Sequence, residues 1–166
     1  MGMAWIIRLH YRDVRRANVR RLVDESLSRF GRIDVWINNV GVGITRPPSQ
    51  LTDEDIDAMI QANVKSALYG MQEVLPHFKE RNAGHIINVS SVAGHKVGKN
   101  NAVYAATKTA VRVISEGLRL EVKPWNLRTT IISPGAVATE LPNSVTEADV
   151  AKGIGEFYDE YAIPAD

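Results

Sequence analysis

Tyr104 and Lys108 are the side chains of this sequence whose types and spacing are best suited to chemistry. They stand four residues apart in a stretch with helical character, so both project from one face of the expected helix. A free tyrosine has a pKa of about 10 and is a poor base near neutral pH. A neighbouring ammonium group favours the phenolate and lowers that pKa. Such a pair could transfer the proton that accompanies a hydride transfer, although the same spacing is common on helices with no catalytic role.

Other polar residues follow short apolar runs elsewhere in the chain. Ser91 comes after one such run, where its hydroxyl could bind a substrate carbonyl or could simply cap the following turn. Asn38, Asn39 and Gly41 come after another, where amides and a glycine could meet a cofactor or form a plain strand-to-loop turn. Whether these residues could form one site depends on the strands and helices that would position them.

Apolar periodicity predicts alternating strands and helices. The expected strands are Ala4–Leu9, Ile33–Asn38, His85–Val89 and Leu127–Ser133. The expected helices are Val14–Phe30, Thr52–Arg81, Ala102–Val122 and Glu147–Tyr158. This alternation predicts an α/β domain with a mainly parallel sheet, in which ligands bind at the carboxyl ends of the strands. The polar and glycine residues described above gather at those ends, and so do Pro134 and Gly135.

Local signals indicate where the helices begin and end. Gly31 is expected to cap the first helix, and Thr52 with Asp55 is a helix-start signal. The long helix is expected to be interrupted near Pro76 and to be broken by Gly84, and Pro124 is expected to close the next one.

Taken together, the motifs resemble those of the short-chain dehydrogenase/reductase family. The resemblance covers nearly all of residues 11–141, in the family's order and spacing. It rests on an Asp-Val pair, an Asn-Asn-Val-Gly signature, a serine, a Tyr-x-x-x-Lys element and a Pro-Gly segment followed by a threonine: Asp13-Val14, Asn38-Asn39-Val40-Gly41, Ser91, Tyr104 with Lys108, and Pro134-Gly135 with Thr139. It implies a single Rossmann-like domain over residues 1–166, with a doubly wound parallel sheet.

The family's known chemistry assigns catalytic roles to four residues. Tyr104 would be the general acid/base in the interconversion of an alcohol and a carbonyl, and Lys108 would lower its pKa and bind the nicotinamide ribose. Ser91 would orient the substrate carbonyl. Asn63 matches the family's helix asparagine that holds a water in the proton relay; without the resemblance it would be taken as a surface residue.

The resemblance also implies contacts to NAD or NADP. Asp13 and Val14 would border the adenine, and Val137 and Thr139 would meet the nicotinamide carboxamide. The remaining expected cofactor contacts, besides Tyr104 and Lys108, are Asn39, Gly41, Pro134 and Gly135. The choice between NAD and NADP is made largely at the end of the family's second strand, which this sequence does not contain.

The sequence departs from the family at its front. It has no Thr-Gly-x-x-x-Gly-x-Gly turn, whose backbone normally holds the pyrophosphate at a helix amino end. By alignment it lacks the first two strands and the last one, so we expect an incomplete fold with an exposed edge at Ile33–Asn38. A catalytically inactive relic that acts through protein association is the alternative to an enzyme.

Composition limits the possible partners. Lys and Arg number 20 and Asp and Glu 19, which gives no general reason to expect nucleic acid or an anionic membrane as a partner. An arginine cluster that includes Arg20 and Arg21 is the one feature that favours nucleic acid, and pairing with Asp24 and Glu25 at i,i+4 explains it more simply.

Further expectations concern metals, setting and assembly. There is no cysteine, and the four histidines share no ligand spacing, so we expect no metal. A reducing, cytoplasmic setting fits the absence of cysteine. The family forms dimers and tetramers through the helices at Thr52–Arg81 and Ala102–Val122, so we expect a homo-oligomer that acts on a small-molecule substrate.

Overall fold

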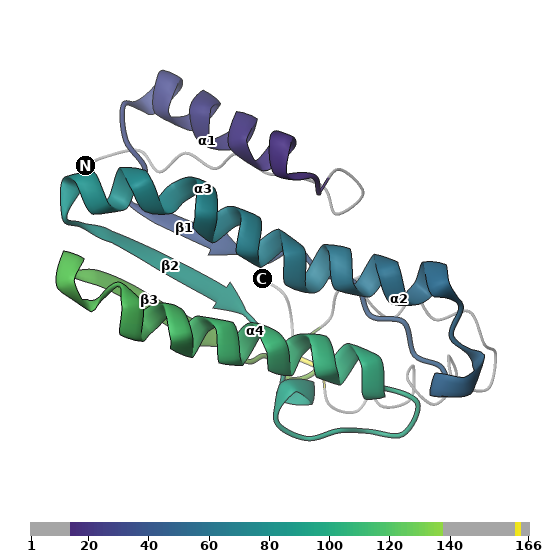
Figure 1. Cartoon of the computed structure of the whole chain (residues 1–166). Coiled ribbons are helices and arrows are strands. Elements are labelled where there is room, and N and C mark those ends of the chain that lie inside the picture. The colour runs from purple at the N-terminus through teal and green to yellow at the C-terminus, as the bar shows by residue number, and fades with distance from the viewer. Residues whose placement is uncertain (1–13, 138–161, 164–166) are drawn as a thin grey trace.

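A parallel sheet of three strands forms the centre of the part of the chain that the structure describes. The computed structural model describes residues 14–137 and 162–163, and the strand expected at Ala4–Leu9 and the helix expected at Glu147–Tyr158 lie outside this range. The strands β1 (Val35–Asn38), β2 (Gly84–Val89) and β3 (Leu127–Ile132) stand in the order β1-β2-β3 (Figure 1). Both pairings are parallel, as the alternation of elements predicted.

Among the described residues, four α-helices and a π-helical segment accompany the sheet. These elements are α1 (Arg16–Phe30), α2 (Asp53–Met59), the π-helix η3 (Ile60–Lys65), α3 (Ser66–Arg81) and α4 (Ala102–Glu121). The segments α2, η3 and α3 follow one another without a break and correspond to the single long helix that the sequence predicted. Three short 3-10 turns connect the larger elements: η2 (Pro48–Gln50), η4 (Val92–Gly94) and η5 (Lys123–Trp125).

The helix boundaries confirm two of the sequence signals and correct two others. Gly31 caps α1 with a left-handed φ of 73°, and Thr52 forms a complete capping box with Asp55 at the start of α2. Pro76 does not interrupt α3, which continues to Arg81. The expectation that Gly84 breaks this helix is also wrong, because the left-handed cap is Asn82, with a φ of 50°.

Gly84 instead makes room for the core. It is the first residue of β2, and a Cβ atom at this position would lie 2.3 Å from the ring of Phe78. Phe78 is fully buried and belongs to the central cluster of apolar side chains. That cluster joins α1, α3, β2 and α4 and includes Val23, Met71, Val74, Ile86, Leu118 and Val122.

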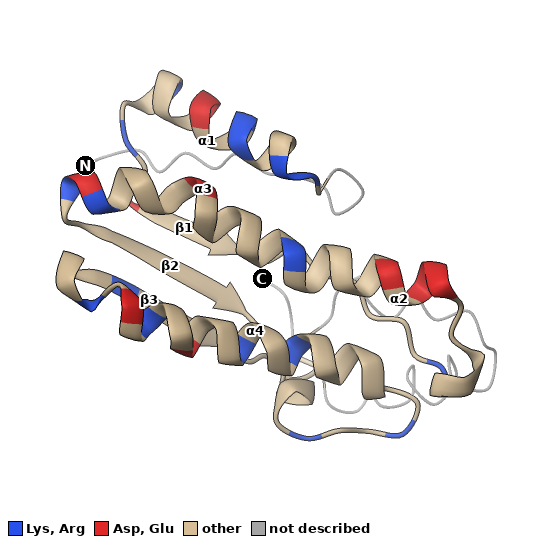
Figure 2. Cartoon of the chain, viewed as in Figure 1, with Lys and Arg blue, Asp and Glu red and all other residues tan. Residues whose placement is uncertain are grey.

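Helix α1 is attached to α3 by ion pairs as well as by apolar contacts. Nε of Arg16 and Nε of Arg20 each donate to the carboxylate of Glu73, at 2.7 and 2.9 Å. The hydrogen bonds from Arg20 and Arg16 lower the pKa of Glu73, and the bond from Arg20 makes the larger contribution. The expected partner of Arg20, Asp24, does interact with it electrostatically, but the hydrogen-bonded partner of Arg20 is Glu73, on another helix. Figure 2 shows that α1, which carries several basic residues, runs beside α3.

The two faces of the sheet differ in how they are covered. Helices α3 and α4 pack on one face, where Ile86 is buried. On the other face, Val35, Ile37 and Ile132 are 47%, 57% and 45% exposed. Within residues 14–137 and 162–163, β1 is an edge strand, as the sequence predicted for Ile33–Asn38.

The described residues contain neither a membrane-spanning helix nor a cluster of metal ligands. None of the helices they form is both long and apolar enough to cross a membrane. They also contain no group of three histidine, aspartate or glutamate side chains placed to hold a metal ion.

Candidate active site

Backbone hydrogen bonds join the carboxyl ends of β2 and β3. Ser90, directly after β2, donates its N–H to the carbonyl of Ile132 at 2.7 Å, and Val92 donates to the carbonyl of Pro134 at 2.9 Å. Helix α4 passes this edge with Lys108, whose backbone carbonyl accepts from the buried hydroxyl of Ser90 at 2.9 Å. The structure therefore brings the segments after β2 and β3 together with the helix that carries Tyr104.

Lys108 is the buried cation of this edge. Only 5% of the residue is exposed, and its Nζ donates to the carbonyl of Val89 at 3.1 Å. The same Nζ lies 5.8 Å from the ring centroid of Tyr104. Burial lowers the pKa of Lys108 from 10.5 to about 8, because the charged form loses hydration. Near pH 7 it remains mostly protonated, in surroundings where its charge is poorly screened.

Tyr104 lies in the first turn of α4, which begins at Ala102. It is half-buried, whereas Lys108 one turn later is buried. The amino end of a helix carries partial positive charge and favours an anion nearby. The amino end of α4 and the ammonium of Lys108 therefore both place positive charge near the ring of Tyr104.

Ser91 caps a turn, which is one of the two roles that the sequence left open for it. It is the N-cap of the turn η4, and its Oγ accepts a hydrogen bond from the N–H of Ala93 at 3.1 Å. Accepting this bond uses a lone pair and leaves the hydroxyl hydrogen available to donate. The turn cap therefore orients the hydroxyl without preventing it from binding a carbonyl oxygen.

Gly41 lets the loop after β1 approach α4. A Cβ atom at this position would lie 3.1 Å from Oδ1 of Asn63 and 3.2 Å from Nζ of Lys108. Both distances are tighter than ordinary side-chain packing, so a larger residue would push against the buried lysine. The glycine of the Asn-Asn-Val-Gly signature is therefore explained by contact with two other predicted site residues.

Asn63 fastens that loop from the π-helical segment η3. Its Oδ1 accepts from the N–H of Val42 at 2.7 Å, and its Nδ2 donates to the carbonyl of Val42 at 2.9 Å. The second hydrogen of Nδ2 goes to Oγ1 of Thr107, also at 2.9 Å. Both amide hydrogens are thus used within the protein, so this side chain cannot also donate to a relay water. Asn63 is 2% exposed, which excludes the surface position considered from the sequence.

The two asparagines after β1 have different surroundings. Asn39 is exposed at the strand end, where a ligand could reach it. Asn38 points into the interior, where its Oδ1 accepts from Nε1 of Trp36 and its Nδ2 donates to Oδ1 of Asn88, both at 2.7 Å. The expectation that both amides could meet a cofactor is therefore corrected for Asn38.

Sequence reasoning missed the continuation of this buried chain. Asn88 is fully buried in β2, and its Nδ2 donates to Oγ of Ser115 on α4 at 2.8 Å. Asparagine is depleted in strands, so an asparagine inside the run His85–Val89 was the signal that could have revealed it. This series of hydrogen-bonded side chains, from Asn38 through Asn88 to Ser115, attaches the end of β1 to β2 and to α4.

Only some of the other expected cofactor contacts lie among the described residues. Val14 is buried, and its carbonyl accepts from Nε2 of Gln61 at 2.8 Å. Val137 forms an isolated parallel bridge with Ile163. Gly135 is exposed, and Pro134 is half-buried after β3. Asp13 and Thr139 lie outside the described residues.

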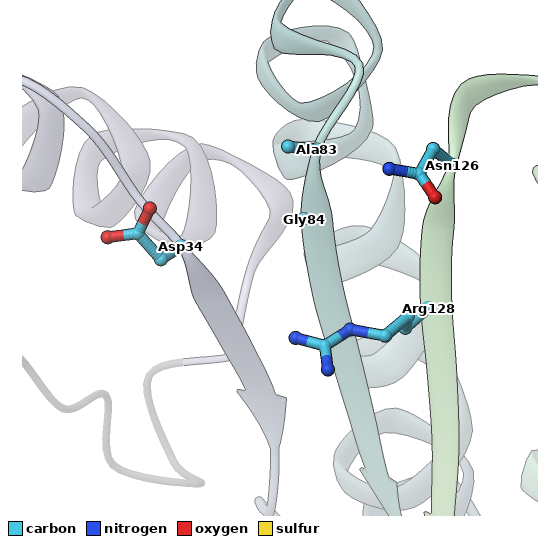
Figure 3. Close-up of a pocket in the computed structure, with 5 residues that line it drawn as sticks. All are labelled: Asp34, Ala83, Gly84, Asn126 and Arg128. Carbon is cyan, nitrogen blue, oxygen red and sulfur yellow. The ribbon is translucent and has the colours of Figure 1, made fainter.

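A hollow of about 370 Å³ lies at the opposite end of the strands, away from the candidate site (Figure 3). It is lined by residues that precede or begin the strands: Asp34, Ala83, Gly84, Asn126 and Arg128. None of the residues that carry the chemistry lines it, so the candidate site is the carboxyl edge and not this hollow.

Comparison with known proteins identifies the fold and the family. The family model described as short chain dehydrogenase matches residues 4–150. The chain belongs to this family. The parallel sheet and the position of the candidate site at its carboxyl edge agree with this assignment.

Relatives of this short-chain dehydrogenase chain occur in bacteria. It is 45% identical over 142 residues to an uncharacterized oxidoreductase of Staphylococcus saprophyticus, and covers 58% of that protein. It is 38% identical over 154 residues to an uncharacterized oxidoreductase of Listeria monocytogenes, and covers 62% of it. These matches take in 84% and 92% of the chain, which spans about three fifths of the length of these relatives.

A solved structure gives the same picture of the fold. The closed form of a serine dehydrogenase complexed with NADP+ superimposes with a TM-score of 0.84 at 33% identity. The similarity covers 96% of this chain and 64% of the serine dehydrogenase. The Rossmann-like α/β architecture expected from the sequence is therefore confirmed.

Proposed function

We propose that this chain is the catalytic part of an NAD(P)-dependent oxidoreductase that interconverts an alcohol and a carbonyl. The observation that supports it best is the buried ammonium of Lys108, 5.8 Å from the ring of Tyr104, at the strand edge that also carries Ser91. Burial of a cation costs free energy, and a purely structural helix position would be better filled by an apolar residue. A cost of this kind is characteristic of functional sites.

Each residue has a defined task in the proposed reaction. The hydroxyl of Tyr104 gives a proton to the carbonyl oxygen during reduction and takes it back during oxidation. Lys108 stabilises the phenolate, and the hydroxyl of Ser91 donates to the same carbonyl oxygen and orients it. When bound, the nicotinamide supplies or accepts the hydride.

The residues present fit the nicotinamide half of such a cofactor. Gly41 leaves an open approach beside Lys108, where a Cβ atom would intrude, and Asn39 is exposed at the same strand end. Lys108 would hold the ribose hydroxyls, and Asn39 and Gly41 would border the cofactor. Val137 and Thr139 would take the carboxamide, with Pro134 and Gly135 shaping the approach, and Asp13 and Val14 would border the adenine.

The cofactor and the substrate are proposed by chemical class only. NADP+ in the similar serine dehydrogenase supports a nicotinamide cofactor and leaves NAD and NADP both open. The substrate would be a small alcohol or carbonyl compound, bound by a cytoplasmic homo-oligomer, without nucleic acid or membrane as partner.

Replacement of Tyr104 by phenylalanine tests the proposal directly. In the shortest form of the protein that shows turnover with NADH or NADPH, Tyr104→Phe should lower kcat by about 10²–10⁴-fold, because the reaction loses its acid/base group. Tyr69→Phe, on α3, is the matched control and should leave kcat nearly unchanged. Near-normal turnover by Tyr104→Phe would remove the acid/base role from this residue.

A further inference from the structure

Two buried links of the same chemical kind attach α4 to the rest of the molecule. In each one, a hydroxyl on α4 accepts a hydrogen bond from a buried asparagine amide and donates to a backbone carbonyl of α4 itself. Ser115 accepts from Asn88 at 2.8 Å and donates to the carbonyl of Val111 at 2.6 Å. Thr107 accepts from Asn63 at 2.9 Å and donates to the carbonyl of Tyr104 at 2.7 Å.

The two links differ in what they attach. The link through Ser115 runs to the middle of the sheet, where Asn88 is part of β2. The link through Thr107 runs by way of Asn63 to Val42, whose N–H and carbonyl are both bonded to that asparagine. It therefore joins the loop after β1 to the first turn of α4.

We propose that Thr107 is a positioning residue, whose hydroxyl, acting through Asn63, holds the loop at Gly41–Val42 in register with the two turns of α4 that carry Tyr104 and Lys108. The catalytic meaning of this link rests on the function proposed above. The link itself can be tested without turnover.

Tight packing around Asn63 restricts how far the loop at Gly41–Val42 can shift relative to α4. A Cβ atom at Gly41 would already make unusually tight contacts with Oδ1 of Asn63, at 3.1 Å, and Nζ of Lys108, at 3.2 Å. A rotation of the Asn63 amide would break the bond between its Oδ1 and the N–H of Val42 and would change the distance between that oxygen and Nζ of Lys108. Thr107 is 4% exposed and Asn63 is 2% exposed, so water from the surface does not readily replace a lost bond.

The chemistry of residue 107 gives a graded series of variants. The threonine hydroxyl accepts a hydrogen bond from Nδ2 of Asn63 and donates one to the backbone carbonyl of Tyr104, and a serine hydroxyl can do the same. Valine has the same shape but can do neither, so it would leave one hydrogen of Nδ2 of Asn63 buried without an acceptor. Serine should therefore preserve the register, and valine should loosen it.

The test is amide hydrogen exchange measured by NMR on the full 166-residue chain. The reporter is the N–H of Val42, which is bonded to Asn63 and not to Thr107. In Thr107→Val, exchange at Val42 should become about tenfold faster, because the lost bond frees the Asn63 amide to rotate. Thr107→Ser should keep the exchange rate within about twofold of the parent.

Ser115→Ala is the matched control. It removes a hydroxyl with the same two bonds from the same helix, so it should reduce overall stability by a similar amount but leave Val42 exchange, corrected for global unfolding, unchanged. Equal acceleration in Thr107→Val and Ser115→Ala would overturn the proposal, and so would lost protection in Thr107→Ser. Thr107→Ala is measured beside the valine variant with the same expectation, so misfolding of one variant does not end the test.

Kinetics then separates this proposal from the function on which it rests. In a form that shows turnover, Thr107→Val should lower kcat and Thr107→Ser should restore it. If Val42 exchange responds as expected and no form shows turnover, the link stands and the enzymatic function fails. If turnover depends on Tyr104 but Val42 does not respond to Thr107→Val, the function stands and the link fails.

Discussion

Lys108 concentrates the conflict between stability and the proposed chemistry in one side chain. Its ammonium is nearly out of contact with water and is compensated by the carbonyl of Val89 at 3.1 Å. A single hydrogen bond to a neutral acceptor does not replace the hydration of a charged group, and the lowered pKa of Lys108 expresses the difference. The buried charge that the proposed reaction requires therefore lowers the stability of the folded state.

Lys108→Met should make the folded protein more stable at pH 7, by about 2 kcal/mol. The pKa of Lys108 is about 8 when folded and 10.5 when unfolded, so the unfolded chain binds more protons between these values. Stability of the parent should therefore rise as the pH increases from about 8 toward 10.5, and the advantage of the methionine variant should shrink over the same range.

Urea denaturation of parent and variant at pH 7 and pH 10 measures this gap. Lys96→Met, a change at an exposed lysine, serves as the control and should alter stability little at pH 7. A methionine variant that is less stable than the parent at pH 7 would show that the buried charge contributes to folding instead of opposing it.

At the scale of elements, local signals were predictable and long-range contacts were not. Gly31 and Thr52 end or begin helices through bonds within a few residues, so the sequence was sufficient to predict them. The hydrogen bonds Asn63–Thr107 and Asn88–Ser115 join residues 44 and 27 positions apart, and no periodicity encodes them. The Tyr104–Lys108 pair was accessible because it depends only on helical spacing. The depth of its burial was not, since that depends on elements packed around it.

Gly70 shows how one such long-range contact limits a helix position. A Cβ atom there would lie 2.2 Å from Oδ1 of Asn38 and 2.4 Å from Nε1 of Trp36. Gly70→Ala should therefore break the first link of the buried polar chain and destabilise the fold by about 2 kcal/mol. Gly117 on α4 has no atom within 4 Å of its Cβ position. Gly117→Ala should instead stabilise by about 0.5–1 kcal/mol, through helix propensity alone.

Thermal and urea denaturation of the two glycine variants provide the comparison. Both substitutions add one methyl group to a helix, so propensity cancels between them and the difference reports the clash. Equal stability of the two variants would show that Trp36 and Asn38 can move aside without loss of their hydrogen bonds.

For the molecule as a whole, the candidate site is better supplied for nicotinamide than for the rest of the cofactor. Lys108, Asn39 and Gly41 gather at the strand edge, but the sequence contains no glycine-rich turn to give the pyrophosphate backbone N–H groups and a helix amino end. Calorimetric titration of residues 1–166 with NADH and NADPH should therefore show binding weaker than about 1 mM. Micromolar binding would mean that the chain holds the phosphates in another way.

The same chain exposes apolar surface of a kind that folded proteins normally cover. On the sheet face opposite α3 and α4, Val35, Ile37 and Ile132 are about half exposed, and β1 is an edge strand of the described sheet. Exposed apolar strands at a sheet edge promote association between chains. The α4 surface, with Leu120 at 62% exposed, is the competing route, since the family resemblance implies assembly through this helix and α3.

Ile37→Lys and Leu120→Lys separate the two routes to association. A charge at position 37 places a lysine on the edge strand, where its desolvation would oppose contact with another chain. If the uncovered sheet face drives association, Ile37→Lys should shift the protein toward monomer in light scattering and sedimentation at a fixed concentration, and Leu120→Lys should not. The reverse result would assign association to α4. An association unaffected by either lysine would require a surface outside both, and a parent chain that is monomeric at high concentration would contradict the expectation of self-association altogether.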